Sequence, residues 1–208
     1  MSQPAPTADL SHPEQAFAEA LPSSRAHHYR WSRRWMRAVL ADLFAVPPAA
    51  VPLDAPPGQA PSLADGWGFV SLSHCPDALA VAWAPWRIGV DLERSDREIP
   101  AEALLRRYFC RHEQEALAGM GGEALRQAVL RHWLLKEAAI KWQRGTLAQD
   151  LADWCCDRAC ERLTHQRHGA VVRSRCWQPG GWSLAVVGAE ADVGDGANPM
   201  HATMLCLA

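Results

Sequence analysis

The chain has 208 residues, of which 49% are hydrophobic, and 21 Lys and Arg stand against 23 Asp and Glu. This composition is typical of a globular protein, and the length allows one mid-sized domain or two small ones. The formal net charge of −2 argues against a dedicated nucleic-acid binder, and the chain has neither an apolar run of the roughly 20 residues that span a membrane nor a secretory signal, so we expect a cytoplasmic protein.

The N-terminal part is predicted to become helical after a loosely ordered start. Residues 1–21 are rich in Pro and Ala, and only a short helix over residues 14–20 is expected there. Over residues 25–45, apolar side chains recur at every fourth position, which indicates a helix. Prolines at positions 47, 48, 52, 56, 57 and 61 then exclude a regular helix, so a surface loop is expected.

Strands and helices alternate in the rest of the chain. Strand-like runs cover residues 69–73, 79–83 and 88–92, and the turns between them predict an antiparallel meander. Helices are expected over residues 101–108, 111–117 and 123–142. A hairpin of residues 171–177 and 182–187, a flexible loop over 188–199 and a last strand over 201–207 complete the prediction.

This order of helix, strands, helices and strands predicts an α+β fold. We interpret it as a pseudo-two-fold duplication of one α+β unit with antiparallel sheets, although the two halves share no visible sequence repeat. The boundary is placed between an N-terminal half, residues 1–95, and a C-terminal half, residues 96–208, and the active site is expected in the cleft between them.

The seven cysteines form no recognisable disulfide framework, so they are predicted to be reduced thiols. A zinc site is a weaker hypothesis for the group Cys155, Cys156, Cys160, His165 and His168. The loops between these residues are shorter than common zinc-finger spacings, and no paired CxxC occurs.

Two carboxylates lie close together at the end of the third predicted strand. Asp91 and Glu93 stand at positions i and i+2, so both side chains project to the same side of the strand. Two adjacent acids repel each other unless a cation or solvent relieves them. They are therefore either metal ligands or solvated residues at a fraying strand end.

The longest predicted helix carries the next candidate residues. Trp133, Glu137 and Lys141 are four residues apart and line one helical face. An ordinary surface pair between Glu137 and Lys141 would contribute only ~0.3–0.5 kcal/mol. The neighbouring residues are largely apolar, however, and charges in such a setting need a partner or a metal.

A third pattern ends the first predicted strand. His74 follows Ser73 where the strand gives way to a Cys-Pro turn. A backbone N–H, a serine hydroxyl and an imidazolium together would suit phosphate oxygens, whereas a lone histidine is more often structural.

These segments resemble, in order, the motifs of the 4′-phosphopantetheinyl transferases. The matching segments are Ser71-Leu-Ser-His74, Ile88-Gly-Val-Asp-Leu-Glu93 and Trp133-Leu-Leu-Lys-Glu-Ala-Ala-Ile-Lys141, with Arg107-Tyr-Phe109 and Glu113 between the last two. The length and two-half layout resemble the monomeric, Sfp-type group. The resemblance is clear from about Arg33 to Lys141 and holds only in outline beyond.

The resemblance implies transfer of the 4′-phosphopantetheine arm of coenzyme A to a serine of an apo acyl or peptidyl carrier protein. It implies that Asp91, Glu93 and Glu137 hold Mg²⁺, or alternatively Mn²⁺. Glu137 is the candidate general base and Glu113 is its rival. Lys141 would contact the diphosphate, and the role of Lys136 is open.

The same resemblance implies a coenzyme A site. Ser73 and His74 would bind its phosphates together with Arg33 and Arg37, and Arg25 and Arg30 are further candidates. The family often has a Gly-Lys-Pro turn where this chain reads Gly58-Gln-Ala-Pro61, so its lysine is missing. Loose candidates for contact with the carrier are Arg106, Arg107 and Arg111.

Two other functions remain open from the sequence. The same three acids could serve a metal-dependent phosphoesterase acting on a nucleotide diphosphate with water as the nucleophile. The chain could also be a non-catalytic module that binds coenzyme A or a carrier protein.

Overall fold

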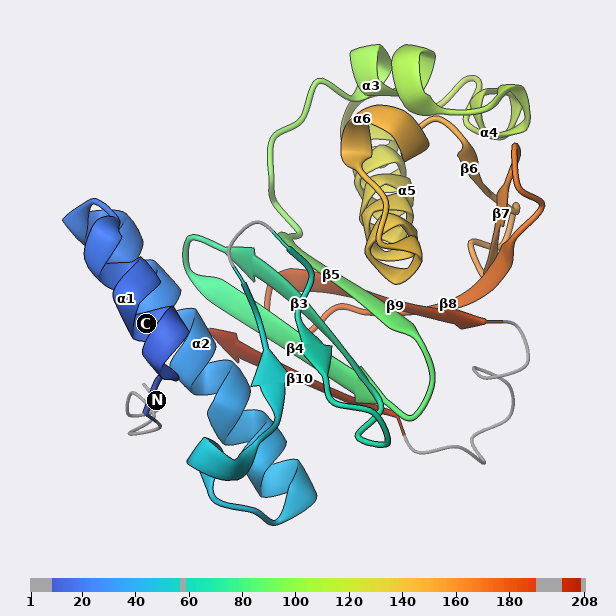
Figure 1. Cartoon of the computed structure of the whole chain (residues 1–208). Coiled ribbons are helices and arrows are strands. Elements are labelled where there is room, and N and C mark those ends of the chain that lie inside the picture. Colours follow the sequence, from blue (N-terminus) through green and yellow to red (C-terminus); the bar gives the residue numbers. More distant parts are fainter. Residues whose placement is uncertain (1–8, 57–58, 190–199, 207–208) are drawn as a thin grey trace.

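The computed structural model of the protein describes residues 9–56, 59–189 and 200–206 (Figure 1). Two antiparallel sheets lie face to face in the centre, and a long helix covers the outer face of each. The predicted α+β class with antiparallel sheets is therefore confirmed.

The N-terminal helices are α1 (His12–Ala20) and α2 (Ser23–Phe44). Glu14 of α1 is buried, and its Oε2 accepts a hydrogen bond from Nε of Arg37 in α2 at 3.0 Å. This ion pair fixes α1 against α2. The short helix predicted over residues 14–20 is therefore present and begins two residues earlier, whereas residues 1–8 lie outside the described part. The proline-rich segment that follows contains the 3₁₀ turn η1 (Pro48–Ala50) and the short antiparallel pair β1 (Leu53–Asp54) and β2 (Ser62–Leu63).

The first central sheet has the strand order β10-β4-β3. Its strands are β3 (Phe69–Cys75), β4 (Ala78–Ala84) and β10 (His201–Cys206). In β4, Leu79 and Val81 pack against α2, whereas the alternating alanines pack against the second sheet. Small side chains on that face let the two sheets approach closely.

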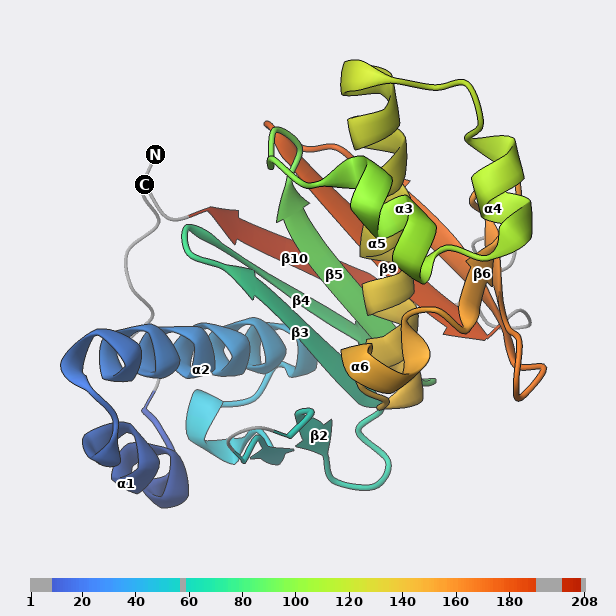
Figure 2. The same cartoon turned by 90° about the horizontal axis from the view of Figure 1, so that it is seen from above.

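The second sheet has the order β5-β9-β8-β7-β6 and carries α5 (Gly122–Gln143) on its outer face (Figure 2). Its strands are β5 (Ile88–Arg94), β6 (Trp154–Cys156), β7 (Arg162–His165), β8 (Val171–Trp177) and β9 (Trp182–Ala189). Three shorter helices surround α5, namely α3 (Ala101–Tyr108), α4 (Arg111–Ala116) and α6 (Leu147–Asp150). Of the loop predicted over 188–199, residues 188 and 189 belong to β9, and residues 190–199 lie outside the described part.

The predicted meander is wrong for its third strand. β5 pairs with β9 rather than with β4. It meets β3 through side chains instead, because the backbone N–H groups of Val90 and Leu92 donate to the hydroxyls of Ser71 and Ser73 at 3.0 and 3.2 Å. β10 likewise joins a sheet of earlier strands, so strand pairing crosses the predicted boundary after residue 95, and that division stays a prediction.

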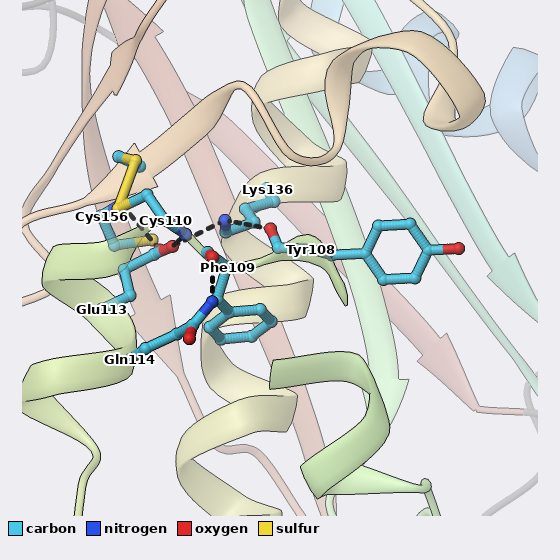
Figure 3. Close-up of a disulfide and its surroundings, with 8 residues drawn as sticks. Tyr108, Phe109, Cys110, Glu113, Gln114, Lys136 and Cys156 are labelled. Atoms are coloured by element: carbon cyan, nitrogen blue, oxygen red, sulfur yellow. Dashed lines mark hydrogen bonds and ion pairs between the residues drawn. A yellow bond between two sulfur atoms is a disulfide. The ribbon is translucent and has the colours of Figure 1, made fainter. Parts of the chain in front are cut away.

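The prediction that the cysteines are all reduced is also wrong. Cys110 and Cys155 form a disulfide that joins the start of α4 to β6 (Figure 3). The zinc group hypothesised around Cys155 does not come together among the described residues, because Cys155 is bonded to Cys110, whereas His165 lies with Asp150 and Asp153. No helix in the described ranges has both the length and the apolar character to span a membrane.

Candidate active site

The candidate site forms where α5 lies against β5. Gly89, Asp91 and Glu93 alternate along β5 on the face toward this helix. A Cβ atom on Gly89 would lie 2.7 Å from the backbone nitrogen of Trp142 and would also clash with the carbonyl of Ala138. Glycine at this position therefore permits the close approach that brings α5 to the two acids.

Asp91 stands at the centre of this contact and is 2% exposed. Its Oδ1 accepts hydrogen bonds from Oγ of Ser73 at 2.7 Å and from Nζ of Lys141 at 2.6 Å. Its Oδ2 is buried and has no hydrogen-bond partner. A buried carboxylate oxygen without a partner is costly, and a cation would relieve it.

Two further acids surround Asp91. Burial, followed by the negative charge of Asp91, raises the pKa of Glu137 to about 7, although Lys141 opposes the shift. Burial also raises the pKa of Glu93, which forms an ion pair with Arg97. We call Asp91, Glu93 and Glu137, together with Lys141, the carboxylate cluster.

The raised pKa values show that the positive charge nearby does not fully stabilise the ionised acids. Carboxylate oxygens are hard ligands that suit Mg²⁺, and Asp91 Oδ2 is free to bind one, so the residues fit a divalent cation. The three carboxylates do not yet form a compact ligand set. Among the described residues, the groups of potential metal ligands whose donor atoms all lie within 4.8 Å of one another consist of other side chains. A cation would draw the three carboxylates together.

Lys141 also lines a cavity of about 670 Å³ beside the carboxylate cluster, which we call the cationic cavity. Its basic lining residues are Arg33, His74, Arg87, Lys141 and Arg144. Arg33 is only 8% exposed, and its Nε has no hydrogen-bond partner. A buried guanidinium with an unused donor in a basic cavity is suited to an anion such as a phosphate.

A second cavity, of about 530 Å³, shares Arg33, Leu72 and His74 with the first. Arg25 and His28 of α2 lie in its wall. The His28 and His74 rings are 5.1 Å apart, and burial, followed by the charge of His28, lowers the pKa of His74. A bound anion would favour the protonated form of His74 and oppose this shift.

Two residues predicted to bind coenzyme A are placed elsewhere. Arg37 is 4% exposed, and besides Glu14 its guanidinium donates to the carbonyls of Val51 and Leu53, each at 3.2 Å. It therefore holds α1, α2 and the following loop together and does not reach the cationic cavity. Ser73 is also buried, and its hydroxyl positions Asp91 and joins β3 to β5.

Glu113, the rival general base, lies in a different part of the molecule. It is fully buried and its Oε2 accepts a hydrogen bond from Nζ of Lys136 at 2.8 Å (Figure 3). Lys136 also donates to the carbonyl of Tyr108, and Glu113 accepts from the backbone N–H of Cys110. The pair holds α4 against α5, and neither side chain belongs to the carboxylate cluster, so the structure favours Glu137 over Glu113 as the candidate base.

Sequence reasoning missed two arginines of the cationic cavity. Arg87 directly precedes β5, and Arg144 ends α5 in the left-handed conformation with φ 61°. Arg87 directly precedes the strand that carries Asp91 and Glu93, and Arg144 follows the helix that carries Lys141. Closeness to these motifs along the chain could have identified both arginines as candidates. Arg30 is not among the residues that line either cavity.

A comparison with curated proteins finds no match. The family comparison is positive for the part of the chain that contains the whole carboxylate cluster, together with Arg87 and Arg144. Residues 87–187 match the model of the 4′-phosphopantetheinyl transferase superfamily.

Proposed function

We propose that the protein transfers the 4′-phosphopantetheine group of coenzyme A to a serine of an apo acyl or peptidyl carrier protein. One observation carries this proposal. The carboxylate cluster adjoins, through Lys141, a cavity lined by four permanent cations and a histidine. That arrangement suits a substrate with several phosphates and a reaction at a diphosphate, and it agrees with the superfamily match.

In this proposal the cationic cavity binds the phosphates of coenzyme A. Arg33 approaches from α2, Arg87 from the start of β5, and Arg144 from the end of α5. The loop residue Gln59 lines the same cavity, close to where the family often places a lysine. Arg87 and Arg144 supply the positive charge that this lysine would contribute.

Asp91, Glu93 and Glu137 would hold the divalent ion, Mg²⁺ or Mn²⁺. When bound, the ion neutralises negative charge on the diphosphate. The unpartnered Oδ2 of Asp91 is the first candidate ligand atom.

Glu137 is the candidate general base. With a pKa of about 7, its carboxylate can accept the proton of the carrier serine hydroxyl near neutral pH. The seryl oxygen then bonds to the phosphorus that bears pantetheine, while the bond from this phosphorus to the bridging oxygen breaks. Adenosine 3′,5′-bisphosphate leaves with that oxygen, and Lys141 stabilises the charge that develops on it.

The finer assignment is a monomeric, Sfp-type enzyme of the cytoplasm. Carrier proteins of this family are acidic as a rule, and exposed arginines on α3 and α4 offer a complementary surface; they are Arg106, Arg107 and Arg111. Arg106 and Arg111 form exposed ion pairs within their own helices, which are weak and easily exchanged for a partner.

The test is to incubate the purified protein with coenzyme A, Mg²⁺ and an apo acyl carrier protein, and to weigh the carrier by mass spectrometry. We expect the carrier to gain one phosphopantetheine group. The gain should disappear with EDTA and fall at least about 100-fold in Glu137→Gln, the range for loss of a general base. Glu102→Gln on the exposed face of α3 is the matched control and should retain activity.

Other outcomes would contradict the proposal in different ways. Release of adenosine bisphosphate without any carrier would favour the phosphoesterase. Binding of coenzyme A without transfer to several unrelated apo carriers, and with no effect of Glu137→Gln, would favour a binding module.

A further inference from the structure

Two arginines of the cationic cavity lie over aromatic rings. Cζ of Arg33 is 4.8 Å from the centre of the Tyr29 ring, and Cζ of Arg87 is 6.0 Å from the centre of a Trp142 ring. Both separations fall within the roughly 6 Å over which a ring face attracts a guanidinium. Tyr29 stands one helical turn before Arg33 in α2, whereas Trp142 reaches Arg87 from α5.

These two arginines differ from others in the way their charge is balanced. Arg94 also lies over a ring, that of Trp182, at 5.3 Å. Its guanidinium is bound by Asp77 and Asp96, so its charge is neutralised on the spot. In the described part of the chain, no carboxylate forms an ion pair with either cavity arginine, and none lines the cavity.

A ring face suits an arginine that has to bind an anion. The ring orients the guanidinium but leaves its full charge and its N–H donors for a ligand, whereas a carboxylate would use both. Arg33 is 8% exposed, and burying a charge without a partner is costly. Arg87 is exposed, and a ring that restricts a long side chain reduces the entropy lost when the arginine binds a ligand.

We propose that Tyr29 and Trp142 are positioning residues, which hold Arg33 and Arg87 in place to bind a polyphosphate in the cationic cavity. This inference rests on the proposed function only in taking the diphosphate of coenzyme A as the expected anion. Each aromatic residue acts through its arginine. Its loss should therefore weaken binding of the anion and leave the chemical step nearly unchanged.

The test measures the Kd of coenzyme A and of inorganic pyrophosphate for the full-length protein with Mg²⁺ by calorimetry, and the KM and kcat of transfer. We expect Tyr29→Leu and Trp142→Leu each to weaken both ligands by about 3- to 30-fold, the range of a cation–π contact, and to raise KM with little change in kcat. Tyr29→Phe and Trp142→Phe keep a ring face and should retain most of the affinity. Tyr108→Leu removes a ring that contacts Arg107 outside the cavity and should bind both ligands like the wild type.

Double variants separate a positioning role from a merely structural one. In an Arg87→Ala background, Trp142→Leu should change the Kd of pyrophosphate by less than about 2-fold, because its effect depends on the missing guanidinium. Tyr29→Leu should be equally without effect in an Arg33→Ala background. The Tyr29 cycle decides the matter if Trp142→Leu fails to fold.

The proposal is overturned if the leucine variants bind both ligands like the wild type, or if they weaken binding equally when the arginine is absent. It is also overturned if the wild type binds neither coenzyme A nor pyrophosphate. Weakened binding in the leucine variants, with no transfer to any carrier by the wild type, would support this inference and contradict the proposed function. Transfer by the wild type with an unchanged KM in the leucine variants would do the reverse.

Discussion

Glu137 holds its proton far more tightly in the folded protein than an ordinary glutamate does. Its pKa is about 7 against an ordinary value of 4.5, chiefly because the carboxyl is buried and secondly because Asp91 is close. Between these two values the folded state binds more protons than the unfolded state. Stability must therefore fall as the pH rises through this window.

We expect the free energy of unfolding of the wild type, relative to Glu137→Gln, to fall by about 1–3 kcal/mol between roughly pH 5 and pH 8 without divalent ions. Denaturant unfolding at each pH measures it. The Gln side chain cannot ionise, and the raised pKa of Glu93 affects both proteins, so the difference isolates Glu137. Added Mg²⁺ should shrink the decrease by stabilising the carboxylate. A difference that does not change with pH would contradict the burial of this group.

For individual residues, the sequence predicts the acids of the carboxylate cluster but not all of the basic residues that lie near them. Asp91 and Glu93 at alternate positions, and Glu137 and Lys141 one helical turn apart, follow directly from strand and helix periodicity. Whether an arginine faces a cavity or a carbonyl depends on the tertiary neighbours. Arg33 and Arg37 are both arginines of α2, yet Arg37 is bound by Glu14 of α1 and does not line the cationic cavity.

At the scale of the elements, the contact between β5 and α5 depends on Gly89. An alanine there would place its Cβ against the backbone of α5, which cannot move aside like a flexible side chain. We expect Gly89→Ala to lower stability by about 1–3 kcal/mol through overpacking. It should also lower transferase activity, because α5 must shift away from β5 and carry Lys141 away from Asp91.

Denaturant unfolding and the carrier assay together check this prediction. Gly121→Ala is the matched control, because a Cβ at Gly121 meets nothing within 4 Å and the backbone there is extended with φ −149°. We expect it to lower the free energy of unfolding by about 1 kcal/mol or less, because a change at an N-cap position typically costs about 1 kcal/mol. Equal effects of the two substitutions would show that the close approach at Gly89 is unimportant.

Most elements were predictable and their pairing was less so. Periodicity located α2, α5 and the strands β3, β4 and β5 to within a few residues. The partner of β5 could not be inferred, because β9 lies about 90 residues later in the chain and many strands share its apolar pattern. β10 poses the same difficulty, since it returns to β4 from the end of the chain.

At the scale of the whole molecule, the two sheets meet at the seam between β3 and β5. No backbone ladder joins these strands at Ser71 and Ser73, whose buried hydroxyls accept the N–H groups of Val90 and Leu92 instead. A larger side chain at either serine would push the strands apart, and an apolar one would leave a buried N–H without a partner.

We expect Ser71→Ala and Ser73→Ala each to lower the free energy of unfolding by about 1–3 kcal/mol, the cost of an unsatisfied buried donor. Ser24→Ala, at an exposed position of α2, should change it by less than about 0.5 kcal/mol. Ser73→Ala should also reduce transferase activity, because Asp91 loses its hydrogen bond at 2.7 Å. If neither seam variant is less stable than Ser24→Ala, packing of the β4 alanines alone joins the sheets. The seam would then serve only to position Asp91.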